Sequence, residues 1–177
     1  MKKIFLCVIL CIIFLLVGCG SNDSKKNDAD NTESSATGGI GLTYNSTSIT
    51  LGDSFDNIKS GLGEEIRPSE EIAPCDGEGG NHIEHYYNGL LIGTDMSGNV
   101  AYYMIQSDGD DTTDVVREAS TDKGLKLGDS ADRAKELYGE PYNESDYVIA
   151  FSDDTTVLTC GLNEDKTIMY FYFTIKD

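Results

Sequence analysis

The sequence LGDSFDNIKSGLGE, at residues 51–64, returns 76 residues later as LGDSADRAKELYGE, at residues 127–140. Eight of the fourteen positions are identical, including the Leu-Gly-Asp-Ser opening and the Gly-Glu close. A self-match at one fixed offset is typical of an internal duplication. The chain is therefore predicted to contain two tandem repeats, each built around one copy of this stretch.

Each copy is predicted to form a short helix with a defined start and end. Ser54 and Ser130 stand where an N-cap side chain accepts a hydrogen bond from a free backbone N–H of the first turn. Gly63 and Gly139 follow the last apolar residue of each helical pattern, where glycine adopts the left-handed conformation without steric cost. Helices of about ten residues are marginal alone, so each is expected to pack on a sheet.

Strand signals follow each predicted helix. Asn88-Gly89 is a strong two-residue hairpin turn, and other turn residues separate the remaining apolar runs. Strands are expected at residues 82–87, 90–94 and 100–106, then at 146–151, 155–160 and 167–176, with a leading strand in 42–50. The expected fold class is α+β, with repeats at residues 42–123 and 124–177. Each repeat is a short helix followed by an antiparallel meander of about three strands, and the helices pack on one face of the sheet.

The first 18 residues match a secretory signal peptide. Lys2 and Lys3 precede an apolar run at residues 4–17, which is shorter than the roughly 20 residues that span a bilayer. The run ends in Leu-Val-Gly-Cys at residues 16–19, which resembles the lipobox of bacterial lipoproteins. That resemblance implies cleavage before Cys19 and diacylation of Cys19, including palmitate. An ordinary signal peptide with an incidental cysteine is the alternative.

Residues 19–41 are predicted to be a lipidated N-terminus and a disordered tether, because they are polar and nearly free of apolar residues. The protein is then anchored in the cell membrane by lipid and faces the extracytoplasmic side, at the cell surface or in the periplasm. The formal charge is −18, and loss of Lys2 and Lys3 with the leader makes it −20. This charge argues against nucleic-acid binding, which depends on basic side chains. It favours solubility and self-repulsion. Binding of a basic protein partner or of divalent cations is the functional alternative.

The helix motif and the hairpin strands after it resemble the β-lactamase inhibitory protein and the small lipoprotein of the outer-membrane barrel-assembly machinery. The residues that carry the resemblance are Leu51, Gly52, Ser54 and Gly63, then Leu127, Gly128, Ser130, Gly139 and Pro141. The resemblance spans about residues 49–177 and implies that a protein target binds the concave face of the sheet. Two features depart from the inhibitor: each repeat has room for one clear helix rather than two, and the chain has no tryptophan.

Two cysteines, Cys75 and Cys160, remain after the leader and Cys19. Thiols outside the cytoplasm often pair, so a disulfide between the two repeats is predicted. Two free buried cysteines are the alternative, because sequence spacing does not show whether the two side chains meet.

Metal and catalytic sites are not expected. Cys75, His82 and His85 follow a C-x6-H-x-x-H pattern, but a spacing of three on a strand puts the two histidines on opposite faces. A zinc site needs four converging ligands, and only Cys160 could be the fourth. The acidic run that starts at Asp108 does not fit an EF-hand loop, because position 6 is Thr113 instead of glycine and position 12 is Ala119 instead of glutamate. No G-x-S-x-G, P-loop or H-E-x-x-H motif occurs, so no cofactor is expected.

The final strand alternates, and this alternation predicts a binding face. Its apolar set is expected to face the helices: Met169, Phe171, Phe173 and Ile175. Tyr170 and Tyr172 then lie on the open face of the sheet, where a ring with a polar tip offers contact area to a partner. The alternative is that both tyrosines only cover a half-exposed sheet.

The predicted function is a non-enzymatic, protein-binding or inhibitory module, monomeric and membrane-anchored. A structural role in cell-envelope assembly is one alternative. A hydrolase with an unrecognised site is another.

Overall fold

The computed structural model describes residues 40–73, 80–109 and 112–176, and two antiparallel sheets dominate them. The large sheet has eight strands, in the spatial order β3 (Arg67–Ile72), β4 (His82–Tyr86), β5 (Leu90–Thr94), β6 (Val100–Gln106), β11 (Ile168–Ile175), β10 (Thr156–Leu162), β9 (Val148–Ser152) and β8 (Asn143–Glu144). The small sheet has the order β2 (Thr47–Ile49), β1 (Leu42–Tyr44) and β7 (Ser120–Thr121). Three short helices complete the fold: α1 (Phe55–Leu62), α2 (Asp114–Glu118) and α3 (Ala131–Tyr138).

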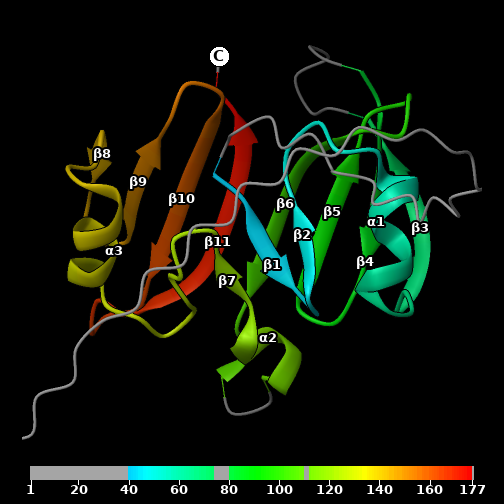
Figure 1. The fold of residues 1–177 in the computed structure, drawn as a ribbon. Coiled ribbons are helices and arrows are strands. Elements are labelled where there is room, and N and C mark those ends of the chain that lie inside the picture. The colour runs from blue at the N-terminus through cyan, green and yellow to red at the C-terminus, as the bar shows by residue number, and fades with distance from the viewer. Residues whose placement is uncertain (1–39, 74–79, 110–111, 177) are drawn as a thin grey trace, which may run out of the picture. The chain divides into compact units, whose positions relative to one another are not determined.

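The predicted fold class, α+β with helices packed on the sheet in two tandem repeats, is wrong. The protein is mostly β, with 45% of the described residues in strands and 17% in helices. The two expected strand sets are not separate, because β6 pairs antiparallel with β11 and joins them into one sheet. The inner face of that sheet is covered in part by the small sheet rather than by helices alone (Figure 1).

The two copies of the Leu-Gly-Asp-Ser motif nevertheless take the same local structure. Gly52 and Gly128 have φ of 85° and 87°, the left-handed region that favours glycine. The next residue closes each turn with its side chain. Asp53 Oδ2 accepts a hydrogen bond from the N–H of Thr50 at 2.8 Å, and Asp129 Oδ2 accepts one from Lys126 at 2.9 Å.

The predicted helix ends are confirmed. Ser54 and Ser130 are the N-cap residues, and Gly63 and Gly139 end the helices with φ of 99° and 84°. The two caps differ in one respect. Ser130 Oγ accepts a hydrogen bond from the backbone N–H of Arg133 at 3.1 Å, whereas the Ser54 side chain makes no capping bond.

This difference predicts unequal costs for two matched substitutions. Ser130→Ala removes a capping hydrogen bond and is expected to lower the free energy of unfolding by about 1 kcal/mol. Ser54→Ala removes no capping hydrogen bond, so it should lower the free energy of unfolding by only a few tenths of about 1 kcal/mol. Urea denaturation of the two variants measures the difference. Equal losses at both positions would contradict the unequal capping.

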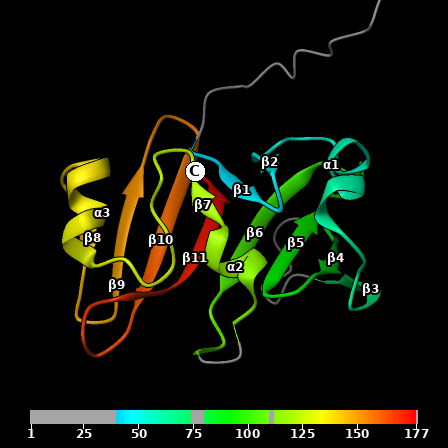
Figure 2. The same cartoon turned by 60° about the horizontal axis from the view of Figure 1, so that its bottom comes forward.

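The core lies between the inner face of the large sheet and a second layer made of α1, the small sheet and α3 (Figures 1 and 2). One row of inward side chains crosses the sheet in register: His85, Ile92, Tyr103, Phe173, Leu158 and Phe151. At one end of the row, Phe55 of α1 stacks on His85 with ring centroids 3.8 Å apart. At the other end, Tyr138 of α3 packs on Phe151. In the middle, the Tyr103 hydroxyl donates to the Ile49 carbonyl of the small sheet at 3.1 Å.

The expected alternation of β11 holds at its centre and fails at its ends. Phe171 and Phe173 are fully buried, as predicted, but Met169 is 39% and Ile175 58% exposed. The register shifts where β11 passes the Gly161–Leu162 step of β10, so Met169 has no partner across the pair. This bulge changes the face of the residues before it and buries Ile168.

The predicted leader and Cys19 lie outside the described residues, as does nearly all of the tether. Within residues 40–73, 80–109 and 112–176, no helix is both long and apolar enough to cross a membrane.

Candidate functional site

The side of the large sheet that faces away from the second layer is called the open face here. Both cartoons show α1, α2, α3 and the small sheet on the opposite side (Figures 1 and 2). Cross-strand pairing assigns these side chains of the central strands to the open face: Glu84, Tyr86, Leu91, Tyr102, Met104, Gln106, Tyr170, Tyr172, Thr174, Val157 and Thr159. All but Tyr86 and Gln106 are half-buried, and those two are buried and exposed respectively.

Both predicted partner-binding residues, Tyr170 and Tyr172, lie on the open face and are half-buried. Tyr170 lies against Gly161 on the neighbouring strand β10, where a Cβ atom would come within 1.9 Å of its ring. Tyr102 covers Gly93 in the same way, with a Cβ distance of 2.2 Å. A strand glycine often marks such a close approach, and an aromatic ring over it restores lost packing. Tyr170 therefore has a structural role besides any role in binding.

Tyr102 is a member of the site that sequence reasoning missed. Adjacent tyrosines at positions 102 and 103 point to opposite faces: Tyr103 is fully buried in the core, and Tyr102 is on the open face. The rings of Tyr102 and Tyr172 meet edge-to-face with centroids 6.2 Å apart. His82 packs on the other side of Tyr102, at 5.4 Å. An aromatic band therefore runs from β4 across β6 to β11.

A carboxylate lies at one end of this band. The hydroxyl of Tyr102 donates to Glu84 Oε1 at 2.7 Å, and the hydroxyl of Tyr86 donates to Glu84 Oε2. The hydrogen bond to Glu84 raises the pKa of Tyr86 above its usual value. Burial, together with the bond to Glu84, raises the pKa of Tyr102 strongly. Both tyrosines therefore stay protonated donors at neutral pH, and the three residues are called the Glu84 cluster below.

A shallow cleft of about 400 Å³ adjoins the Glu84 cluster. Its walls include Leu91, Met104, Gln106 and Asp108 beside Glu84 and Tyr86. Arg67 of the edge strand β3 also lines it, with its guanidinium carbon 3.4 Å from the centroid of the Tyr86 ring. Such a distance is typical of a cation–π contact.

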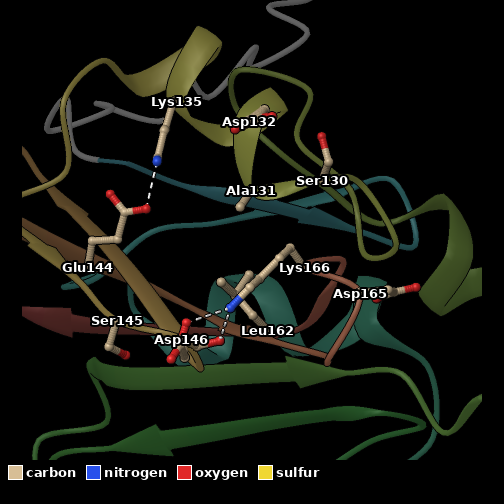
Figure 3. A pocket seen from close by; sticks show the side chains of 10 residues that line it. All are labelled: Ser130, Ala131, Asp132, Lys135, Glu144, Ser145, Asp146, Leu162, Asp165 and Lys166. Carbon is tan, nitrogen blue, oxygen red and sulfur yellow. Dashed lines mark hydrogen bonds and ion pairs between the residues drawn. The ribbon is translucent and has the colours of Figure 1, made fainter.

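A second cleft, of about 600 Å³, lies between α3 and the segment around β8 (Figure 3). The two lysines that line this cleft each form an ion pair with a carboxylate that also lines it. Lys135 Nζ lies 2.6 Å from Glu144 Oε1, and Lys166 Nζ lies 3.0 Å from Asp146 Oδ1. This arrangement ties α3 and the turn before β11 to the β8 segment, and it presents no unpaired lysine to a ligand.

The candidate metal ligands do not come together. His82 packs on Tyr102 of the open face, whereas His85 stacks on Phe55 in the core and contacts Glu65 Oε1 through Nδ1 at 2.9 Å. The prediction that these histidines occupy opposite faces is confirmed. Among the described residues, no group of three His, Cys, Asp or Glu side chains is arranged to hold a metal ion.

The predicted disulfide stays a prediction, because Cys75 lies outside the described residues. Cys160 is fully buried in the core on β10. Burial raises the pKa of its thiol to about 12, so the reactive thiolate is scarce at neutral pH.

The open face thus combines aromatic contact area with one carboxylate held between hydroxyl donors. This chemistry suits recognition of another surface. No family model matches the chain, and neither a curated protein nor a solved structure matches it.

Proposed function

We propose that this protein is a membrane-anchored, extracytoplasmic lipoprotein whose folded part is a non-enzymatic protein-binding or inhibitory module. The open face of the large sheet is its binding surface. The proposed anchor is the lipidated Cys19, for which the Leu-Val-Gly-Cys pattern at residues 16–19 is the support.

One observation carries the proposal: the rings of Tyr102 and Tyr172 in the aromatic band, and Tyr170 on the same face, lie half-buried where no described helix or second sheet packs on them. Tyrosine is enriched in protein interfaces because it offers a large rigid surface and a polar tip. The rings are held by neighbouring rings and by strand glycines, so little side-chain freedom is lost when a partner covers them.

A capture experiment tests the proposal. The chain from Gly20 onward contains every described core residue, so it is immobilised without its leader and incubated with detergent-solubilised envelope of the native host. The matched bait carries Tyr170→Ala and Tyr172→Ala. A partner retained in stoichiometric amount by the natural face and lost from the variant supports the proposal. Identical captures by both baits, or no capture, overturn it. Several envelope-assembly subunits in place of one partner favour the structural role.

The captured partner then allows a quantitative prediction. Tyr170→Ala with Tyr172→Ala is expected to weaken binding about tenfold or more, the effect of losing central tyrosine contacts. The melting temperature should fall by only a few degrees, because both side chains are half-exposed in the free protein.

The control removes two tyrosines elsewhere. Tyr142 and Tyr147 are 62% and 72% exposed and lie outside the central strands. Replacing both by alanine should leave the affinity unchanged. An equal loss of affinity in the control variant would place the binding surface elsewhere. Unfolding of the open-face variant would show that the two tyrosines are structural residues.

A further inference from the structure

We propose that the Glu84 cluster and its cleft form a receptor site for an arginine side chain, which a protein partner presents to the open face. The assignment to a protein partner rests on the proposed function. The recognition of the guanidinium group rests on the geometry of the cluster alone.

The first argument is charge. Glu84 pairs across the strands with Glu70 of β3, and like charges directly opposite each other are unfavourable. Within the described parts of the chain, no Lys, Arg or His lies within ion-pair distance of the Glu84 carboxylate. An ionised carboxylate has about four acceptor positions, and the two tyrosine hydroxyls use two of them. A cation placed here would relieve the repulsion and gain charge-assisted hydrogen bonds.

The second argument is the aromatic surroundings. The ring of Tyr102 covers Gly93, and its hydroxyl donates to Glu84 Oε1, so an aromatic ring lies directly beside the carboxylate. The protein's own Arg67 stacks on Tyr86 at 3.4 Å, which demonstrates that a ring of this cluster accommodates a guanidinium group. Arginine fits better than lysine, because its planar group stacks on rings and donates several hydrogen bonds in one plane.

The third argument is space. The cleft of about 400 Å³ begins at Glu84 and runs along Leu91 and Met104. These apolar side chains suit the methylene stem of an arginine, whose charged end stays in a polar environment. The cleft is lined by two carboxylates, Glu84 and Asp108, and by one cationic side chain, Arg67. The lining therefore remains electronegative even with Arg67 in place.

The test uses a small probe and the chain from Gly20 onward. N-acetyl-arginine amide is titrated into the isotopically labelled protein and amide shifts are followed by two-dimensional NMR. N-acetyl-citrulline amide, which has nearly the same shape and no charge, is the matched neutral probe. We expect saturable shifts around Tyr86, Leu91 and Tyr102 with the arginine probe, and binding weaker by roughly tenfold with the citrulline probe.

Three variants separate recognition from folding. Glu84→Gln keeps an acceptor for one tyrosine hydroxyl and should lose most of the arginine response. Glu164→Gln, in the exposed turn between β10 and β11, removes the same charge and should bind the arginine probe as the natural protein does. Tyr102→Phe keeps the ring and frees one carboxylate oxygen, so it should still bind.

Equal responses to the two probes, an unchanged response in Glu84→Gln, or no saturable shift overturns the arginine site. Loss of binding in both Glu84→Gln and Tyr102→Phe would show a merely structural role for the cluster. These outcomes do not depend on the capture experiment. A captured partner whose affinity ignores Glu84→Gln leaves the binding function intact and removes only the arginine site. A positive titration without any captured partner supports arginine recognition by the Glu84 cluster and contradicts the proposed binding function.

Discussion

Phe171→Ala is expected to lower the free energy of unfolding by about 3–5 kcal/mol, the usual cost of emptying a buried phenylalanine position. Phe171 is fully buried on β11 and pairs with Ile105 on one side and Cys160 on the other. It therefore stands at the strand that joins the two halves of the large sheet. Urea denaturation followed by circular dichroism measures the loss.

Met169→Ala is the matched control for this substitution. Met169 is two residues away on the same strand, but it sits at the bulge and is 39% exposed. Its replacement should change the stability by less than about 1 kcal/mol. A loss at Phe171 as small as that at Met169 would mean that β11 does not form the centre of the core.

Cys19→Ser is expected to abolish membrane anchoring in the native host. The hydroxyl of serine cannot form the thioether that carries the diacyl group. Each buried methylene of an acyl chain contributes about 0.8 kcal/mol, and stable anchoring needs more than one chain. Without them the protein should remain an uncleaved precursor or be released. Detergent phase partitioning and the mass of the mature N-terminus are the measurements.

The leader supplies the control for this prediction. Cys11 lies in the apolar run and leaves with the predicted leader, so Cys11→Ser should give processed, detergent-partitioning protein. If the Cys19→Ser protein partitions into detergent like the processed form, the anchor is not at Cys19.

Much of the strand arrangement was predictable from local pattern. The strands expected at 90–94 and 100–106 coincide with β5 and β6, because apolar alternation and the Asn88-Gly89 turn specify their positions. The edge strands β3 and β8 were missed. Every residue of both is exposed, so neither carries an apolar face that a sequence pattern reveals. The short helix α2 was not predicted either.

The candidate site was only partly predictable. Alternation along one strand placed Tyr170 and Tyr172, since facing direction is a local property. The Glu84 cluster depends instead on register between strands: Gly93 opposite Tyr102, and Glu84 opposite Gly93. Those pairings join segments separated in sequence, and single-strand patterns do not contain them. Gly93 and Gly161 inside apolar strands were the available signal of close ring contact.

The edge strand β3 has a consequence for encounters between copies of the molecule under the proposed lipid anchor. Lipid-anchored molecules meet often and in similar orientations, which favours pairing between unprotected sheet edges and growth of shared sheets. The outer edge of this sheet reads Arg-Pro-Ser-Glu-Glu-Ile, and all six residues are exposed. Pro68 offers no N–H to a neighbouring strand, and in an antiparallel pair centred on Glu70 and Glu71 each glutamate would face a glutamate of the second copy. Under the lipid anchor proposed above, crowded copies of this molecule should therefore stay separate, because this edge resists the first pairing step of polymerisation.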